Sequence, residues 1–143
     1  SKHKVPYILM HMRGNPENMM SKTNYENVTK DVCKYFSQRI NKAHSCGIND
    51  IIIDPGFGFS KTIQQNYELL NNLEFFKEFQ RPIIIGISRK SMICKTLNIT
   101  SDKALNGSSV LHTISLMKGA NILRTHDVKE AVECVKIVSQ LIG

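Results

Sequence analysis

Short apolar runs and longer segments of helical periodicity alternate along this chain of 143 residues. The apolar runs predict strands over residues 7–12, 50–54, 82–88 and 121–126. The three consecutive isoleucines Ile51, Ile52 and Ile53 are typical of a parallel strand that is buried on both faces. Glycine and proline residues follow the first two runs and indicate that loops begin there.

After each predicted strand, apolar residues recur every three or four positions, which indicates an amphipathic helix. We expect these helices over residues 25–46, 62–79, 102–118 and 128–141, with a short additional helix near residues 90–97. Asn24 is the expected cap of the first helix, and Gly47 is expected to follow its last turn. The apolar residues expected on one face of the last helix are Val128, Ala131, Val132, Val135 and Val138.

This alternation favours βαβ units and a parallel sheet. Two architectures fit it, a doubly wound sheet and a (β/α)8 barrel, of which four βα units would form one half. The first residue is a serine rather than an initiator methionine, and no signal peptide follows. We therefore expect the sequence to begin within a longer protein.

Composition and charge exclude several classes of protein. No run approaches the ~18 apolar residues that a membrane span requires, so we expect no membrane segment. The formal net charge is +7, but the lysines are scattered and no aromatic-plus-basic motif occurs, so we expect no nucleic-acid partner. The four cysteines fit neither a zinc pattern nor a disulfide framework, which favours a reducing cytoplasm.

Polar residues gather where the predicted strands end. In both architectures ligands bind at the carboxyl ends of parallel strands, and buried polar groups are costly unless they are used or paired. We therefore expect a site at this rim. The four strand ends are Met10-His11-Met12-Arg13-Gly14, Asp54-Pro55-Gly56, Ser88-Arg89-Lys90-Ser91 and Arg124-Thr125-His126-Asp127.

Asp54 has two equally supported interpretations. Its carboxylate can accept two parallel N–H bonds from an aminopyrimidinone edge, or it can cap the turn that Pro55 and Gly56 form. Lys90 and Ser91 open a short helix, where backbone N–H groups attract anions, although an exposed basic turn is the simpler interpretation of these two residues alone.

Arg124 and His126 are two residues apart on a predicted strand and therefore share one face. Arginine can stack on an aromatic ring or bind phosphate, so we favour a role in a binding site. The alternative is a surface ion pair between Arg124 and Asp127 with His126 as a cap. His44 and His112 lie within helices and are expected to face solvent or to be satisfied there.

Four segments in one order resemble the C-terminal half of the bacterial-type dihydropteroate synthases. They are His11-Met12-Arg13-Gly14-Asn15-Pro16, then Asp54-Pro55-Gly56-Phe57-Gly58-Phe59 with Lys61 two positions later, then Ser88-Arg89-Lys90-Ser91-Met92-Ile93, then Arg124-Thr125-His126-Asp127-Val128. The resemblance implies a (β/α)8 TIM barrel, of which residues 1–143 form a single pterin-binding domain with about the last four β/α units. One departure is Ser60, where the family often has a third glycine.

The resemblance also implies an activity, that of a transferase in folate biosynthesis. Members of this family condense (7,8-dihydropterin-6-yl)methyl diphosphate with 4-aminobenzoate to 7,8-dihydropteroate and diphosphate, with assistance from Mg²⁺. By the same resemblance the partners are small molecules, and a homodimer is possible. Two alternatives stay open, a non-catalytic barrel remnant and a pterin-dependent methyltransferase barrel.

Matched residue by residue, the resemblance assigns roles to these strand ends. Asp54 would hold the N–H edge of the pterin and Lys90 its carbonyl side, while Arg124 would stack on the ring. His126 would bind the departing diphosphate. The remaining assignments are Thr125 in the same pterin diphosphate site, Met10 and Phe59 as apolar contacts, and Ser91 near the carboxylate of 4-aminobenzoate.

No residue is expected to act as a strong acid or base, because the arylamine is already neutral at pH 7 and positioning can carry the rate. We expect no metal ligand in this chain, since the resemblance places the magnesium-binding asparagine in the N-terminal half. For the same reason we expect that these 143 residues do not form a complete site by themselves.

Overall fold

The computed structural model describes residues 5–142, over which strands and helices alternate as predicted. The strands are β1 (Tyr7–Met10), β2 (Ile51–Asp54), β3 (Ile84–Ile85) and β4 (Ile122–Leu123). The α-helices are α1 (Val28–Ser45), α2 (Ile63–Asn71), α3 (Ser91–Leu97), α4 (Leu105–Met117) and α5 (Val128–Ile142). Short 3-10 helices are η1 (Met19–Ser21), η2 (Leu73–Phe79) and η3 (Ser101–Lys103).

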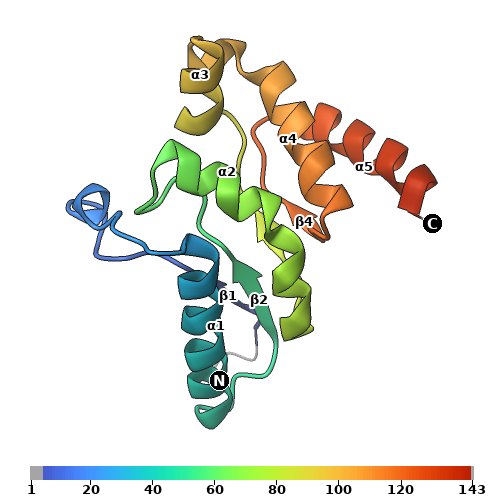
Figure 1. Ribbon diagram of the computed structural model, residues 1–143. Helices are drawn as coiled ribbons and strands as arrows, with labels where there is room; N and C mark the ends of the chain where they lie inside the picture. Colours follow the sequence, from blue (N-terminus) through green and yellow to red (C-terminus); the bar gives the residue numbers. More distant parts are fainter. Residues whose placement is uncertain (1–4, 143) are drawn as a thin grey trace.

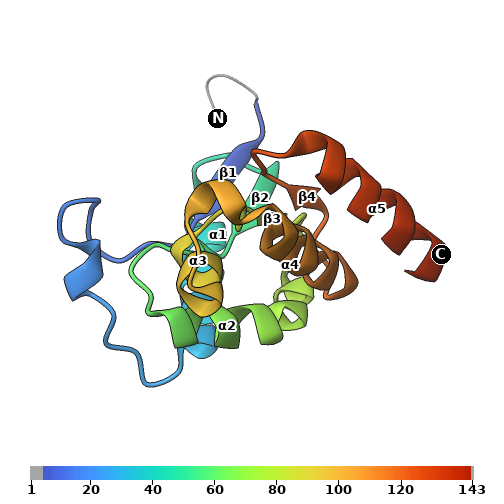
Figure 2. The ribbon, with the colours of Figure 1, turned by 90° about the horizontal axis from the view of Figure 1, so that it is seen from above.

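The four strands are parallel and follow one another in sequence order. β1 pairs with β2, β3 pairs with β4, and a parallel bridge between Ile53 and Ile83 joins the two pairs. Figures 1 and 2 show α1, α2 and α4 on the same side of these strands, and α5 packs beside α4. This arrangement confirms the prediction of parallel βα units and corresponds to an arc of a barrel wall.

The strands are shorter than the apolar runs predicted. β3 and β4 each end after two paired residues. Beyond them the two segments stay joined by isolated bonds, because the N–H of Arg124 donates to the carbonyl of Ile85 and the N–H of His126 donates to the hydroxyl of Ser88. Residues 86–88 and 124–126, the ends of the predicted strands, carry polar residues of the rim.

The apolar pattern marked the buried residues only in part: Ile51 and Ile53 are buried and Ile52 is half-buried, so the prediction that β2 is buried on both faces is only partly confirmed. In β1, Tyr7 and Ile8 are exposed.

The helix ends differ from the prediction at three places. The helix predicted over residues 102–118 begins only at Leu105, because residues 101–103 form the 3-10 helix η3. Asn27 rather than Asn24 caps α1, because its side chain accepts the N–H of Lys30. The predicted helix over residues 62–79 divides into α2 and the 3-10 helix η2, and α2 starts with a capping box between Thr62 and Gln65. Gly47 follows α1 with a φ of +74°, as predicted.

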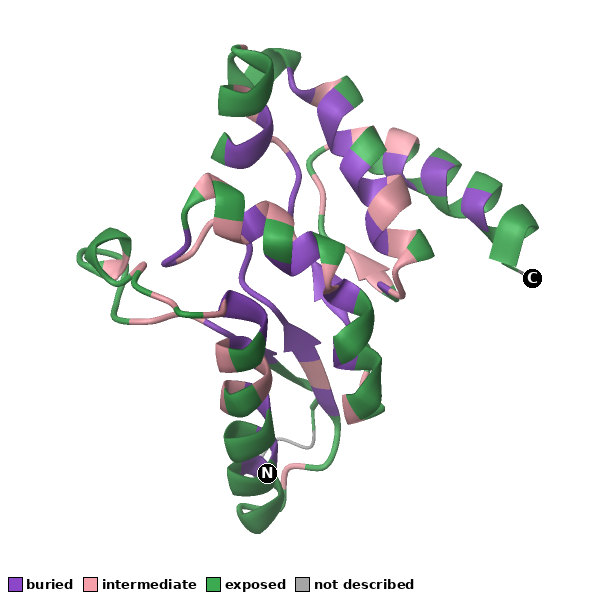
Figure 3. Cartoon of the chain, in the orientation of Figure 1, coloured by how far each residue is buried: buried purple, intermediate pink, exposed green. Residues whose placement is uncertain are grey.

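The core lies between the strands and their helices (Figure 3). Ile51 and Ile53 of β2 are buried beneath Phe36 of α1 and Phe76 of η2, whose rings meet edge to face at 5.6 Å. Helix α5 is a partial exception to the prediction. Its Ala131, Cys134 and Val138 are buried, whereas Val128, Val132 and Val135 of the predicted apolar face are exposed.

Within residues 5–142, no helix combines the length and the apolar character that crossing a membrane requires.

Candidate active site

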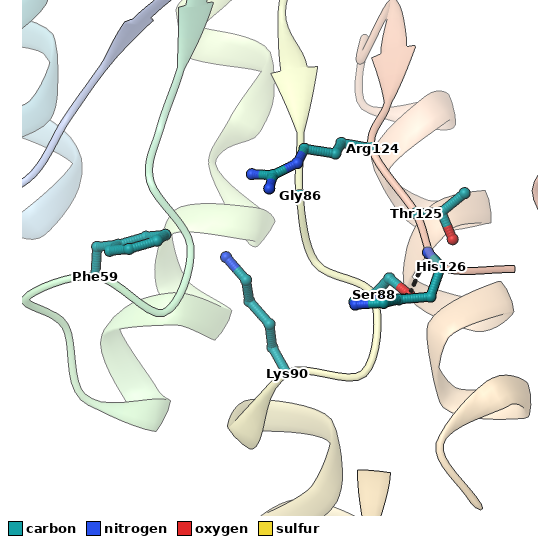
Figure 4. Close-up of a pocket in the computed structure, with 7 residues that line it drawn as sticks. All are labelled: Phe59, Gly86, Ser88, Lys90, Arg124, Thr125 and His126. Carbon is teal, nitrogen blue, oxygen red and sulfur yellow. Dashed lines mark hydrogen bonds between the residues drawn. The ribbon is translucent and has the colours of Figure 1, made fainter. Parts of the chain in front are cut away.

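Five of the predicted site residues come together in one pocket of about 350 Å³ at the carboxyl ends of the strands. The pocket lies among the loop after β2, the start of α3 and the segment after β4 (Figure 4). Its lining residues are Phe59, Gly86, Ser88, Lys90, Arg124, Thr125 and His126.

Arg124 and His126 both line the pocket, as their spacing predicted. Figure 4 shows the guanidinium group of Arg124 extending over Gly86 toward Phe59 and Lys90. The alternative of an ion pair between Arg124 and Asp127 is wrong, because Asp127 pairs with Arg89 through two bonds of 3.0 and 2.5 Å. This pair lowers the pKa of Asp127 and leaves Arg124 directed into the pocket.

The ring of His126 is held by Ser88 on the neighbouring strand end. The Ser88 hydroxyl accepts the backbone N–H of His126 at 3.3 Å and lies 3.0 Å from its Nδ1. A hydroxyl that accepts one N–H still has its own proton, which it can donate to Nδ1. When Ser88 donates this proton to Nδ1 of a neutral His126, the ring proton lies on Nε2, the nitrogen that is not bonded to Ser88.

Lys90 stands at the N-cap of α3, opposite Phe59. Its Nζ lies 4.7 Å from the centre of the Phe59 ring and donates to the carbonyl of Phe57. Desolvation lowers the pKa of Lys90, while the charge of Asp54 acts in the opposite direction. The ammonium group is therefore a partly desolvated cation whose position the loop after β2 fixes.

Asp54 is the last residue of β2 and is only 9% exposed. Its Oδ1 accepts the N–H of Gly56 at 2.8 Å, so the turn-capping interpretation is correct. The carboxylate forms no ion pair within 4.0 Å among residues 5–142 and retains free lone pairs. Burial raises its pKa, and the bond from Gly56 and the nearby charges of Lys90, Lys61 and Arg124 oppose that shift. Both interpretations of Asp54 are thus compatible.

Three predicted site residues do not line this pocket: Asp54, which lies nearby at the end of β2, Ser91 and Met10. Ser91 is the first residue of α3 and its side chain is exposed. Met10 ends β1 beside Asp54, and its carbonyl accepts the hydroxyl of Tyr35 at 3.0 Å. Their assigned roles stay predictions.

Two lining residues have no role predicted from the sequence: Gly86, and Ser88, which was expected only as part of the third strand end. They precede Lys90 at intervals of two, the spacing that places residues on one face of an extended segment, so this signal was available. His112 also differs from expectation. It is 1% exposed, and its Nε2 has no hydrogen-bond partner among the described residues.

The charges of the pocket suit an anionic ligand with a flat ring. Lys90 and Arg124 are cations, Phe59 offers an aromatic face, and the buried carboxylate of Asp54 is nearby. Over the described part of the chain, no three His, Cys, Asp or Glu side chains are close enough together to hold a metal ion.

Residues 1–126 match the model of the family described as pterin binding enzymes. The chain is 43% identical over 136 residues to the dihydropteroate synthase of Escherichia coli strain K12, covering 94% of this chain and 48% of that protein. It is 42% identical to the dihydropteroate synthase of Haemophilus influenzae, covering 93% of this chain and 49% of that protein. The chain therefore spans about half the length of these curated relatives.

Two solved structures have the same fold. The dihydropteroate synthase of Yersinia pestis, solved with a sulfonamide drug complex, superposes with a TM-score of 0.95 at 39% identity, over 98% of this chain and 52% of that one. The dihydropteroate synthase of Thermus thermophilus, solved in complex with 4-aminobenzoate, superposes with a TM-score of 0.94 at 31% identity. This superposition covers 99% of this chain and 59% of that one. The predicted fold, about half of the pterin-binding TIM barrel, is confirmed.

Proposed function

Because this chain belongs to the pterin binding enzyme family, we propose that it forms the C-terminal half of a dihydropteroate synthase. The observation that carries the proposal is the single pocket in which Phe59, Lys90, Arg124 and His126 meet near the buried Asp54. The proposed reaction joins (7,8-dihydropterin-6-yl)methyl diphosphate to 4-aminobenzoate, giving 7,8-dihydropteroate and diphosphate.

The pterin is the part of the substrate for which these residues are best suited. A dihydropterin has adjacent N–H donors on its pyrimidinone edge, which the free lone pairs of Asp54 can accept. Lys90 can donate to the ring carbonyl on the same edge. Arg124 has a planar guanidinium that can stack on the bicyclic ring. Charge-assisted bonds of this kind contribute about 1.5–3 kcal/mol each when they replace contacts with water.

The leaving diphosphate would be bound by His126 and Thr125. With Nδ1 held by Ser88, the Nε2–H of His126 is available as a donor to a phosphate oxygen. The bond from the pterin methylene carbon to the diphosphate oxygen breaks, and the electron pair leaves with the diphosphate. The arylamine nitrogen then forms the new C–N bond and loses its proton to solvent.

Positioning and electrostatic stabilisation would carry most of the rate. Lys90 and Arg124 make the pocket positive and favour the build-up of negative charge on the leaving group. The neutral arylamine requires no prior deprotonation, which is consistent with a pocket whose charged lining residues are cations. Ser91 would contact the carboxylate of 4-aminobenzoate from the exposed start of α3, and Met10 the pterin from β1.

Magnesium remains a proposal supported only by the family. The described residues offer no cluster of metal-binding side chains, and the charged groups of the pocket are cations that would repel Mg²⁺. We therefore assign none of these residues to the metal. Its binding would depend on the substrate diphosphate and on the part of the barrel that this chain does not contain.

The proposal is tested by assaying the full-length protein with both substrates and Mg²⁺, and by comparing Arg124→Met with the control Lys136→Met, at an exposed position of α5. We expect dihydropteroate to form, and the Arg124 variant to lose at least about tenfold in kcat/KM while the control stays unchanged. An Arg124 variant as active as the wild type would contradict the proposed site. Pterin binding without turnover would favour the non-catalytic remnant.

The proposed setting is the cytoplasm, in agreement with four free cysteines. The homodimer also stays a prediction. Sedimentation of the full-length protein tests it. A particle with twice the mass of one chain would be the predicted dimer, and a particle with the mass of one chain would contradict the prediction.

A further inference from the structure

Lys61 is a buried lysine to which the proposed mechanism gives no role. It ends the loop that follows β2, its side chain is 2% exposed, and it does not line the pocket. No carboxylate lies within 4.0 Å of its Nζ in the part of the chain that the structure describes. Lysine is seldom fully buried without an ionic partner, so its surroundings must satisfy the ammonium group in another way.

Three acceptors surround the Nζ of Lys61. It lies 3.0 Å from the carbonyl of Gly56, 3.0 Å from the carbonyl of Phe59 and 3.0 Å from Nδ1 of His11. An ammonium group has three N–H donors, so each acceptor can receive one bond. His11 can accept because it is neutral: burial, and then the charge of Lys61, lower its pKa to about 3.

The ring of His11 is itself fixed in place. It is 3% exposed and meets the ring of Tyr35 edge to face, with the centroids 5.0 Å apart. Lys61 thereby ties the loop after β2 to the end of β1, where His11 follows Met10. The ring of His11, which follows the first strand at the rim, is therefore buried.

The backbone of the loop from Asp54 to Lys61 is poorly suited to regular hydrogen bonding. Its carbonyl groups therefore require side-chain donors such as the ammonium group of Lys61. Gly56, Gly58 and Ser60 all have left-handed φ values, of +72°, +79° and +50°. A Cβ on Gly56 would lie 2.0 Å from the carbonyl oxygen of His11, so the loop crosses the end of β1 at very close range. The two carbonyls that Lys61 binds belong to this loop.

The same loop carries two groups of the proposed pterin site. Asp54 begins it, and Oδ1 of Asp54 bonds to Gly56, whose carbonyl Lys61 holds. Phe59, which lines the pocket, is held through its own carbonyl. Lys61 therefore lies buried behind the loop, while Phe59 lines the pocket and Asp54 lies close enough to Lys90 and Arg124 for their charges to act on its carboxylate.

We propose that Lys61 is a positioning residue of the pterin site, whose buried ammonium group holds Asp54 and Phe59 in the geometry that binds the ligand. This inference rests on the proposed function of the pocket. A neutral amine has only two N–H donors and directs a lone pair at the third acceptor. Loss of the proton therefore loosens the loop, and pterin affinity falls with it.

The charges around Lys61 set the pH at which this happens. Asp54 at the end of β2 favours the ammonium form, while Lys90 at the start of α3 and Arg13 after β1 disfavour it. His11, the remaining titratable neighbour, is neutral. Desolvation is the largest effect, and together these influences lower the pKa of Lys61 to about 7. Pterin affinity should thus decline as the pH rises above neutrality.

The test is a pH series of pterin diphosphate binding, measured by calorimetry on the full-length protein from pH 6 to 9. The wild type should bind progressively more weakly above about pH 7. Lys61→Met should bind about tenfold or more weakly at pH 6.5 and should lose this alkaline decline, because the bonds to the two loop carbonyls and to His11 are gone. The control Lys95→Met, on the exposed side of α3, should match the wild type.

A second measurement does not depend on pterin binding or on a folded variant. Long-range ¹H–¹⁵N spectra of the wild type report which ring nitrogen of His11 carries the proton. We expect the Nε2–H form, with Nδ1 accepting from Lys61. An Nδ1–H form, or a Lys61→Met protein with wild-type affinity and an unchanged pH profile, would overturn the inference while leaving the proposed function intact. A wild type with the Nε2–H form of His11 that binds no pterin would instead overturn the proposed function.

Discussion

Replacing Asp54 with asparagine separates its two roles in the structure. Oδ1 of Asp54 accepts the N–H of Gly56 at 2.8 Å, and the amide oxygen of asparagine can keep that bond. The other carboxylate oxygen becomes an NH₂ group. This group cannot accept the N–H donors of a pterin and places a donor against them. The turn should therefore survive while the ligand contact is lost.

The expected magnitude follows from the environment of Asp54. The carboxylate is 9% exposed, so little water is available to replace the lost acceptor. A hydrogen bond to a charged group contributes about 1.5–3 kcal/mol, which corresponds to roughly a 10- to 150-fold rise in Kd. The natural control is Asp50→Asn, an exposed aspartate just before β2, which should leave Kd unchanged.

The assay is calorimetric titration with the pterin diphosphate, combined with thermal unfolding to verify that the variant folds. The pH dependence gives a second readout. Burial raises the pKa of Asp54, so its carboxylate becomes protonated at a higher pH than that of an exposed aspartate. Wild-type affinity for the pterin should therefore begin to fall at that higher pH as the solution is acidified. The asparagine variant should lack this acidic decline. A folded Asp54→Asn protein with a Kd within twofold of the wild type would refute the assignment.

Three further changes have defined outcomes. Ser88→Ala removes the hydroxyl that holds His126, so we expect kcat to fall about tenfold with pterin affinity little changed; an unaltered kcat would contradict this role. Gly56→Ala places a Cβ against the carbonyl of His11 and should lower the free energy of unfolding by at least about 2 kcal/mol in urea titrations, whereas neutral behaviour would disprove the close contact. His112→Leu removes a buried nitrogen that has no partner among the described residues and should stabilise the protein by about 1 kcal/mol. Because burial lowers the pKa of His112, the unfolded state takes up the proton first as the pH falls below 6.5, so the gain should be larger at pH 5 than at pH 7; an equal or smaller gain would refute this explanation.

The sequence predicted the order of the elements because each one has a local signature. In β2 and α1 the buried face of the element alone explains the pattern. It accounts for the isoleucines of β2 and for the helical spacing of Val32 and Phe36 in α1. The position of polar residues at strand ends likewise follows from chain order alone. These features are sufficient to place Arg124 and His126 in one pocket.

Other features depend on contacts between distant segments and have no local signature. Spacing alone cannot tell that Asp127 pairs with Arg89 rather than with Arg124, because Arg89 lies on another strand end, 38 residues earlier in the chain. The face of α5 that is buried depends on where α4 lies. The burial of Lys61 depends on His11, fifty residues earlier in the chain.

A crystal structure of the full-length protein with the pterin diphosphate bound tests the proposed pterin site most directly. We expect the pterin edge within hydrogen-bonding distance of the Asp54 carboxylate, the ring stacked on Arg124, and a phosphate oxygen within reach of Nε2 of His126. A ligand bound elsewhere, or in this pocket without contact to Asp54 and Arg124, would contradict the proposed site.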